Sequence, residues 1–287
     1  MYEIGIQGLI TGVMLGLIYA LIALGLSLIF GVMNVVNFAH GDFVMLSMYL
    51  TYAFGTALAW DAILTPIITF PLLFLFGFIT YYLLIDRTLR QLYVVQLAVT
   101  VGLQILIRSV ALIVWKGQPR TLTYSMIQGS FEVGGYTILT SRLFAAAISV
   151  VIIGAVAYFL SKTWPGAAIR AASDDLDAAS LMGINYHRTY ALTFAIGSAL
   201  TAIAGGLLMS FQQTDPMGGM RFGTLSWCIL ILAGVGSIPG LIISGIIVGI
   251  AEMLAISYFD PRSGLVAVYM IFILTLWVAP KGLFGRK

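Results

Sequence analysis

The stretch that decides the fold class runs from Ile4 to Phe30 and reads IGIQGLITGVMLGLIYALIALGLSLIF. These 27 residues carry no charge, and a transmembrane helix needs about 20 consecutive apolar residues. The preceding Met1-Tyr2-Glu3 lacks the basic segment of a secretory signal peptide, and the run is longer than the apolar core of such a peptide. We therefore expect this run to remain in the protein as its first membrane-spanning helix.

The composition of all 287 residues extends this expectation to the whole chain. Apolar residues make up 61% and charged residues only 9%, whereas a soluble domain carries about 25% charged residues. So few charged side chains cannot cover a water-exposed surface, which excludes a soluble enzyme and a nucleic-acid-binding protein. The single cysteine, Cys228, excludes a disulfide framework and a cysteine metal cluster. The sequence predicts a polytopic membrane protein.

The apolar residues form continuous runs rather than alternating segments, which favours helices over the strands of an outer-membrane barrel. The run at 224–237 is short and is followed by Gly236-Ser237-Ile238-Pro239-Gly240, so it is a candidate re-entrant or broken element. We predict an all-α fold with eight to nine spans in a single domain over residues 1–287. The runs lie at about 5–30, 36–58, 62–85, 94–115, 142–160, 190–211, 224–237, 241–258 and 264–280.

Basic residues predict the orientation, because Lys and Arg are retained on the cytoplasmic side. The loops near 87–90 and 162–188, with the tail 281–287, hold eight of them, and the alternate loops hold five. This bias predicts a cytoplasmic C-terminus, a cytoplasmic loop at about 162–189 and an extracytoplasmic loop at about 116–141. The extracytoplasmic loop contains Glu132-Val133-Gly134-Gly135, which is typical of a short hairpin or an irregular cap.

The loop at 162–189 is the most polar part of the chain. Trp164-Pro165-Gly166 is expected to stop the preceding helix, and a new helix is predicted over Ala167–Met182 with Gly183 at its end. Spacings of three and four residues place Ile169, Ala172, Leu176 and Ala179 on one apolar stripe. The opposite side carries Arg170, Asp174 and Asp177. Such a helix can lie on the cytoplasmic surface and present a docking face; the alternative is an ordinary linker helix.

Four polar side chains interrupt the apolar pattern after the first run: Asn34, Asn37, His40 and Asp42. An ionised Asp at the bilayer centre costs about 2.5–3.5 kcal/mol, so such groups normally face the bundle interior or a water-filled path. On a regular helix His40 and Asp42 would point apart, although a break at Gly41 would change this. One interpretation is a segment that lines a path or forms its gate. The other is a structural joint in which these side chains cap helix ends.

Two charged residues, Arg108 and Glu252, fall inside apolar runs. An ion pair between them, or a contact with a backbone carbonyl, explains them as well as a role in transport does. His187 lies beside Arg188 in a loop and is expected to be solvated. Glycines four residues apart allow helix backbones to approach closely, and three such pairs occur: Gly12/Gly16, Gly236/Gly240 and Gly245/Gly249.

Two motifs resemble a known family. Asp177-Ala178-Ala179-x-x-x-Gly183 resembles the EAA-x-x-x-G motif by which permease subunits of ABC importers dock against their ATPases, with Asp in place of Glu and without the Leu-Pro that follows further on. Residues 25–43, GLSLIFGVMNVVNFAHGDF, are similar to the signature of the branched-chain amino acid ABC importer permeases, shorter-subunit type. The resemblance extends from about residue 8 to the C-terminus, with matching segments at 166–171, 183–185, 194–200, 204–206 and 280–285.

The resemblance implies a permease subunit in a bacterial or archaeal plasma membrane. It also implies three protein partners, namely a second related permease, cytoplasmic ATPase subunits and an extracytoplasmic solute-binding protein. Membrane lipid surrounds the permease itself. No Gly-Lys-Ser/Thr occurs in the chain, so ATP and Mg²⁺ are expected on the separate ATPase, and no cofactor, metal site or catalytic residue is expected here. The coupling residues implied are Arg170, Asp174, Asp177, Ala178, Ala179 and Gly183.

The candidate residues for a substrate path or gate are Asn34, Asn37, Phe38, His40, Gly41 and Asp42. The family implies branched-chain or other hydrophobic amino acids as substrates, with urea, short amides or aromatic acids as the alternative. An ion-coupled secondary transporter using Asp42, His40 or Glu252 and a passive channel are competing classes. Neither class needs a docking surface, so the helix predicted in the inner loop argues against both.

Overall fold

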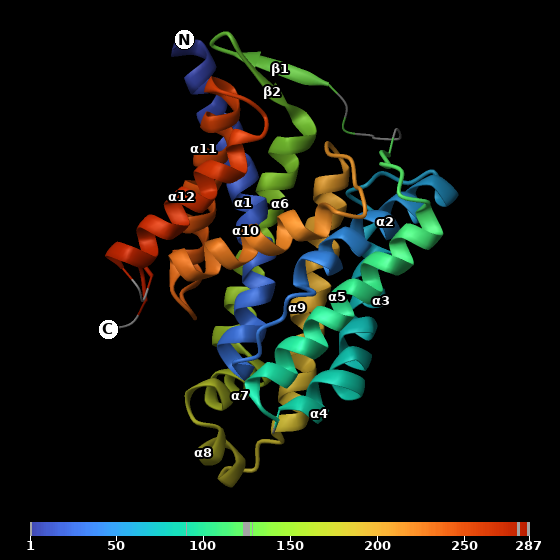
Figure 1. The fold of residues 1–287 in the computed structure, drawn as a ribbon, viewed down its shortest axis with the longest axis vertical. Coiled ribbons are helices and arrows are strands. Elements are labelled where there is room, and N and C mark those ends of the chain that lie inside the picture. Colours follow the sequence, from blue (N-terminus) through green and yellow to red (C-terminus); the bar gives the residue numbers. More distant parts are fainter. Residues whose placement is uncertain (1, 90, 123–126, 128, 280–281, 286–287) are drawn as a thin grey trace.

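The computed structural model describes residues 2–89, 91–122, 127, 129–279 and 282–285. In this part of the chain nearly every element is a helix, and one short hairpin projects from one end (Figure 1). The elements are α1 (Tyr2–Met33), α2 (His40–Leu58), α3 (Pro66–Thr80), the π-helical turn η1 (Tyr81–Ile85), α4 (Asp86–Thr88), α5 (Tyr93–Trp115), β1 (Ser130–Val133), β2 (Tyr136–Leu139), α6 (Thr140–Lys162), α7 (Trp164–Asp174), α8 (Leu176–Leu181), α9 (Tyr186–Met209), α10 (Gly218–Ala233), α11 (Ile238–Tyr258) and α12 (Ser263–Val278).

Among the described residues, six helices are long and apolar enough to cross a bilayer: α1, α3 with its continuation to Thr88, α5, α6, α9 and α11. The apolar helices α10 and α12 have 16 residues each. At 1.5 Å per residue they are about 24 Å long, shorter than the hydrocarbon core of about 30 Å. The expected all-α polytopic bundle is therefore confirmed, whereas the expected count of eight to nine spans is not.

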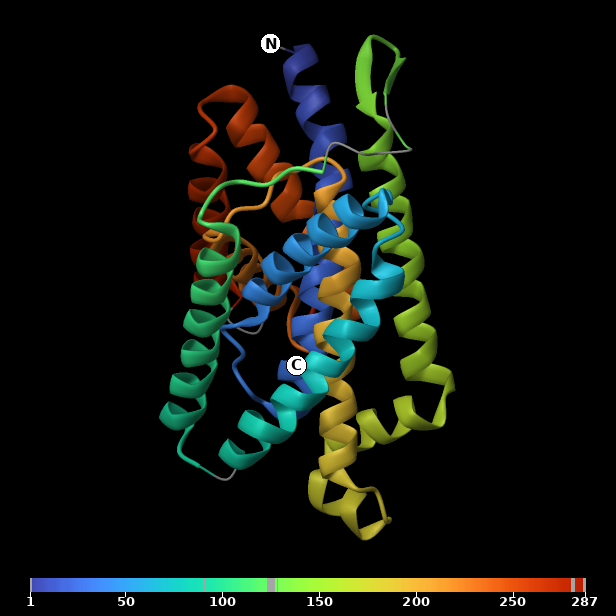
Figure 2. The ribbon, with the colours of Figure 1, turned by 90° about the vertical axis from the view of Figure 1, so that its right-hand side faces the viewer.

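Helices α1 and α9 form the centre of the bundle. In each of them 83% of the most apolar stretch is buried, against 22–28% in α3, α5 and α6. Helix α1 packs against α11, α9, α10 and α6, and α9 packs against α3 and α2 (Figures 1 and 2). The peripheral helices expose large apolar side chains such as Ile67, Ile113 and Val151, as surfaces that face lipid do.

Glycine permits the tightest helix contact, between α1 and α11. A Cβ on Gly12 would lie 2.6 Å from the Ile250 Cα, and a Cβ on Gly245 would lie 2.5 Å from the carbonyl oxygen of Gly16. A larger side chain at either position would force the helices apart. The close helix packing expected of Gly12/Gly16 and Gly245/Gly249 is thus confirmed. Gly236, from the third pair, instead lies in the turn before α11, where its φ is 85°.

The two long loops lie at opposite ends of the bundle (Figure 1). The described part of loop 116–141 includes the antiparallel hairpin of β1 and β2, in which Ser130 pairs with Leu139 and the turn glycines, Gly134 and Gly135, have φ of 61° and 85°. The expected hairpin is therefore confirmed. Loop 162–189 forms α7 and α8 at the other end, and this placement fits an orientation with one loop on each side of the membrane.

Candidate functional site

The segment that joins α1 to α2 is a defined structural joint. Asn34 ends α1 in the left-handed conformation, with φ of 52°, and its amide donates a hydrogen bond to the Phe30 carbonyl oxygen at 2.9 Å. Asn37 is buried, and its side-chain oxygen accepts a hydrogen bond from the Ala39 amide at 3.1 Å, just before α2 begins. The helix break therefore lies at residues 34–39, and Gly41, where a break was considered, lies inside α2. Asn34 thus ends α1 through its backbone conformation, and the Asn37 side chain stabilises the turn that precedes α2.

Gly41 has a different role, since it brings α2 against α10. A Cβ on Gly41 would collide with the carbonyl oxygen of Gly219 and with the amide of Gly223. His40 fastens the same turn of α2 to α1, because its Nε2 donates to the carbonyl oxygen of Ile22 at 2.9 Å. The first turn of α2 is therefore buried between two other helices.

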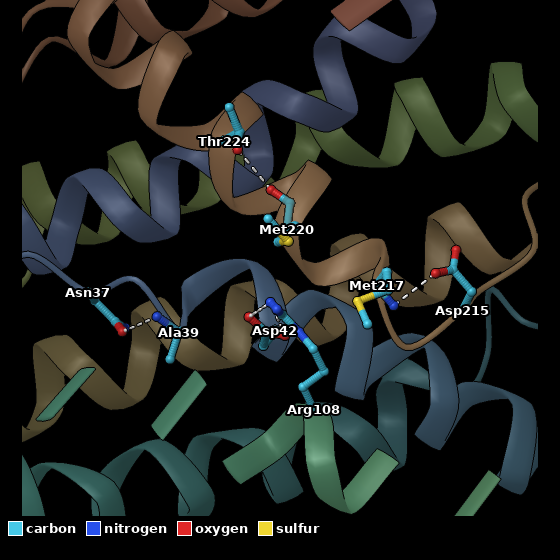
Figure 3. A network of polar contacts seen from close by, with 8 residues as sticks. All are labelled: Asn37, Ala39, Asp42, Arg108, Asp215, Met217, Met220 and Thr224. Carbon is cyan, nitrogen blue, oxygen red and sulfur yellow. Dashed lines mark hydrogen bonds and ion pairs between the residues drawn. The ribbon is translucent and has the colours of Figure 1, made fainter. Parts of the chain in front are cut away.

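Asp42, one residue further along α2, forms an ion pair with Arg108 of α5 (Figure 3). The Nε of Arg108 lies 3.3 Å from Oδ1 of Asp42, and its Nη2 lies 3.2 Å from each carboxylate oxygen. The Asp42 carboxylate is fully buried, while the Arg108 side chain is 16% exposed. A Cβ on Gly219 would collide with this carboxylate, so the glycine of α10 also leaves room for the ion pair.

Glu252 pairs with a different arginine, so of the alternatives left open for Arg108 and Glu252, an ion pair between the two is wrong. The Nη2 of Arg221 on α10 lies 2.6 Å from Oε1 of Glu252 on α11, and 3.4 Å from the Tyr19 hydroxyl of α1. The Glu252 side chain is 2% exposed and that of Arg221 is 35% exposed. Helix α10 is therefore held on one side by its glycines against α2, and on the other by an ion pair to α11.

Beside the Asp42–Arg108 pair, the joint and the start of α10 expose apolar side chains. Phe38, Met217 and Met220 are 39%, 56% and 57% exposed. The Phe38 ring packs against Trp227 of α10, with the ring centroids 6.2 Å apart. Figure 3 shows both methionines on the stretch of chain that passes Asp42. We call this surface the α10 face, made of Phe38, Met217, Met220, Thr224 and Trp227.

The expected path residues therefore divide into two groups. The exposed residues are Asn34 and Phe38. The buried residues are Asn37, His40, Gly41 and Asp42. Only Asn34 and Phe38 can therefore contact a solute. The buried residues instead fix the position of the joint through their contacts with α1, α5 and α10.

Loop 162–189 contains two helices rather than the single one predicted over Ala167–Met182. Asp175 interrupts it, because its carboxylate caps α8 by accepting a hydrogen bond from the Ala178 amide at 2.9 Å. Helical periodicity alone does not reveal this cap, since an aspartate also fits the polar side of a continuous helix. Gly183 ends α8 with φ of 83°, as predicted.

The preceding helix ends before Trp164, as predicted, but Trp164-Pro165-Gly166 forms the first turn of α7, which therefore begins three residues before the predicted Ala167. Helix α6 ends at Lys162, and the side chain of Thr163 caps α7 by accepting from the Gly166 amide at 3.2 Å. The apolar stripe is buried at Ile169, Ala172 and Ala179 and half-buried at Leu176.

The tip of the inner loop is exposed, and it carries two large apolar side chains. Leu181 and Met182 are 89% and 83% exposed. We call this surface the α8 tip, made of Asp177, Ala178, Leu181, Met182 and Gly183, all of them exposed. His187, just beyond it, is not simply solvated, because its Nδ1 lies 2.6 Å from Oδ1 of Asp86 and so links α9 to α4.

Arg170 and Asp174 lie apart from the α8 tip, in the wall of a cavity. This half-open cavity has a volume of about 1020 Å³ and lies between α7, the C-terminal parts of α1 and α6, and the turn that joins α10 to α11. The structure thus separates the expected coupling residues into a tip on α8 and a cavity wall on α7.

Sequence reasoning missed Arg221, the two methionines and Asp175. The count of basic residues treats Arg221 as a loop residue, although it falls inside the apolar helix α10. Arg221 lies between the glycines at 218–219 and the apolar run that begins at about residue 224, and this position is a signal that could have identified it as a helix residue. The exposure of Met217 and Met220 has no comparable signal, because an apolar side chain in a membrane helix can face lipid, protein or an open path.

Comparisons with known proteins agree with this architecture. Residues 8–276 match the family described as branched-chain amino acid transport system, permease component. The high-affinity branched-chain amino acid transport system permease protein LivH of Escherichia coli (strain K12) is 32% identical over 98% of this chain and 96% of its own length. BraD of Pseudomonas aeruginosa, named for the same system, is 29% identical over the same shares.

A more distant organism holds a further relative. The probable branched-chain amino acid transport permease protein LivH of Methanocaldococcus jannaschii is 29% identical over 92% of this chain and 88% of its own length. No solved structure matches the chain significantly. The family match and the full-length similarity to LivH show that this chain belongs to the permease components of branched-chain amino acid transport systems, which form the membrane part of an ABC transporter.

Proposed function

We propose that residues 1–287 form one permease domain of an ATP-driven importer, which moves branched-chain or other hydrophobic amino acids delivered by an extracytoplasmic solute-binding protein. The names of the relatives and the full-length similarity support the substrate class. The observation that carries the energy coupling is the α8 tip, where Leu181 and Met182 project from one end of the bundle almost fully exposed. Large apolar side chains exposed in this way mark a protein-binding surface.

The α8 tip is the proposed docking surface for a cytoplasmic ATPase, which would hold ATP and Mg²⁺. Asp177, Ala178, Ala179 and Gly183 form the coupling motif there, and Ala179 is the buried residue that seats α8 on the bundle. Asp177 adds a negative charge beside the apolar tip, so a complementary cleft on the ATPase would be apolar with a basic rim. If the ATPase docks there, the α8 tip lies on the cytoplasmic side, and the basic-residue bias puts the C-terminus on that side as well.

The α10 face is the proposed contribution of this chain to the translocation path. A second, related permease would supply the opposite wall. Phe38, Met217 and Met220 offer an apolar surface, which suits amino acids with apolar side chains, and methionine adapts to ligands of different shape. Urea and short amides fit this wall poorly, because they offer almost no apolar surface to it. Aromatic acids fit it better, because the two flexible methionines could make room for a ring.

The ion-coupled alternative is less well supported by the geometry. A secondary transporter would need a carboxylate or histidine that is free to bind a proton or Na⁺. Asp42 and Glu252 are each paired with an arginine, and His40 is bound to the Ile22 carbonyl oxygen. These contacts leave each of the three groups with a structural partner already in place.

The proposal is tested by purifying the chain from its native membrane in mild detergent and identifying by mass spectrometry what co-purifies. We expect an ATPase with a phosphate-binding loop in stoichiometric amount, and we expect Asp177→Arg and Leu181→Asp to remove it. Asp260→Arg is the matched control, because Asp260 is an exposed aspartate that follows the far end of α11. Retention of the ATPase by both α8 variants would refute the docking surface.

A second arm tests transport. In liposomes the assembled complex should take up leucine only with ATP inside and the binding protein outside, and an uncoupler should not abolish uptake. Leucine uptake by this chain alone, lost on addition of an uncoupler, would support the secondary transporter instead. Leucine flux without any energy source would support a channel.

A further inference from the structure

The cavity above α7 has an apolar back and a polar mouth. Leu24, Leu28 and Val32 line it from α1, and Ala157 and Leu160 line it from α6. Residues 24 and 32 are about 12 Å apart along a helix at 1.5 Å per residue, so the apolar wall has the length of several methylene groups. The polar mouth lies at α7, which contributes Arg170, Ser173 and Asp174, and the turn at 235–239 and Phe284 also line the cavity.

The mouth of the cavity lies at the level where a membrane surface is expected. The end of α6 exposes Tyr158 and Lys162, and Trp164 at the start of α7 is 76% exposed. Aromatic and basic side chains gather at the headgroup level of a bilayer. The apolar wall, formed by residues 24–32 of α1 and by Ala157 and Leu160 of α6, therefore faces the acyl-chain region, and α7 lies among the headgroups.

The polar mouth carries one positive and one negative charge. Arg170 and Asp174 are four residues apart on α7, so their side chains leave the same face of the helix, with Cβ atoms about 6 Å apart. Both are exposed, and in the described part of the chain neither takes part in an ion pair. The two charges complement a headgroup that holds a phosphate and, a few ångströms away, a primary ammonium.

We propose that this cavity binds one phospholipid with an ethanolamine-type headgroup from the leaflet that surrounds α7. The headgroup phosphate accepts hydrogen bonds from the Arg170 guanidinium, and the ammonium donates to the Asp174 carboxylate. One acyl chain lies against Leu24 and Leu28 of α1 and Ala157 of α6. The lipid thereby fills the space between α7 and the core helix α1.

This placement has a consequence for coupling. Apart from the Ser173 side chain, whose hydroxyl donates to the Gly31 carbonyl oxygen at 2.8 Å, α7 carries few polar contacts to α1. A bound lipid would transmit movement of α7 to α1 and to the turn before α11, which also lines the cavity. The inference concerns lipid binding alone and holds whichever solute the permease carries.

The test uses the full-length protein with its co-purifying partners, in phosphatidylcholine nanodiscs that contain either phosphatidylethanolamine or phosphatidylglycerol. Native mass spectrometry counts the lipids that remain bound after release from the disc. We expect one phosphatidylethanolamine per chain, retained in preference to phosphatidylglycerol. Arg170→Gln should lower retention of both lipids about tenfold, the usual effect of losing one charge-assisted hydrogen bond.

Two further variants separate the headgroup from the acyl chain. Asp174→Asn should remove the preference for phosphatidylethanolamine while phosphatidylglycerol remains bound. Ala157→Phe should fill the apolar part of the cavity and lower retention of both lipids. The matched controls are Arg188→Gln and Ala155→Phe, because both residues are exposed and neither lines the cavity.

A photoactivatable acyl-chain analogue of phosphatidylethanolamine gives an independent measurement, with expected cross-links to residues 24–32 and 157–161. Retention in Arg170→Gln and Ala157→Phe equal to that of their controls would overturn the proposal. So would equal retention of the two lipids by the wild-type protein. Soluble phosphoethanolamine that displaced the lipid and bound as tightly would show a site for the free headgroup rather than for a membrane lipid.

Discussion

Asp42 of α2 and Arg108 of α5 form a bidentate ion pair beside the exposed face of α10, although 66 residues separate them in the chain. The Asp42 carboxylate is fully buried, and the Arg108 side chain is 16% exposed. The pair joins a helix that packs in the core to a peripheral helix that faces lipid. It therefore fixes the position of α5 relative to the joint that carries Phe38.

Removing one partner of this pair should destabilise the protein more than removing both. In Asp42→Asn the Arg108 guanidinium remains largely buried without its counter-charge, and we expect the free energy of unfolding to fall by about 1–3 kcal/mol. The double variant Asp42→Asn/Arg108→Gln should recover part of that loss. Thermal unfolding in one detergent measures both, and an additive loss in the double variant would mean that the two side chains do not stabilise each other.

Gly41→Ala should separate α2 from α10. The new methyl group would meet the backbone of Gly219 and Gly223, which cannot move away as a side chain can. Overpacking of this kind costs about 1–3 kcal/mol. Gly102→Ala on α5 is the matched control, because nothing lies within 4 Å of its added Cβ. The unfolding temperature and the yield of folded protein are measured for both variants. Equal values for Gly41→Ala and Gly102→Ala would contradict the close contact between α2 and α10.

The α1–α11 contact gives a second prediction of the same kind. A methyl group at Gly249 would lie 2.6 Å from the amide nitrogen of Gly16. We expect Gly249→Ala to lower the unfolding temperature, whereas Gly154→Ala on the exposed side of α6 should leave it unchanged or raise it slightly, since alanine favours a helix by about 1 kcal/mol over glycine. Similar unfolding temperatures for the two variants would show that α1 and α11 are not so closely packed.

The cap at Asp175 predicts a local effect on α8. Asp175→Ala should remove the hydrogen bond to the Ala178 amide and destabilise α8 by about 0.5–2 kcal/mol, while Asp175→Asn should keep the cap. Hydrogen exchange of the α8 amides measures this directly. We expect faster exchange in the alanine variant only, accompanied by weaker retention of the ATPase. Equal exchange in the two variants would show that α8 does not depend on this cap.

Much of the architecture was predictable because the signals are local. The run at residues 4–30 identifies a span by length and hydropathy alone, and it became the central helix α1. Gly183 was predicted to end a helix because glycine adopts positive φ without strain. Local signals did not locate the helix break near Gly41: the break lies earlier, because Asn34 adopts the left-handed conformation and ends α1.

The sequence by itself determined that this chain is a polytopic helical membrane protein of a permease family, because hydropathy and motifs are written along the chain. Only the tertiary structure decided which charges meet: Arg108 with Asp42, and Arg221 with Glu252. The physical reason is that the choice of partner depends on which helices lie side by side. Glycine contacts bring α1 against α11 and α2 against α10 at distances that helical periodicity does not contain.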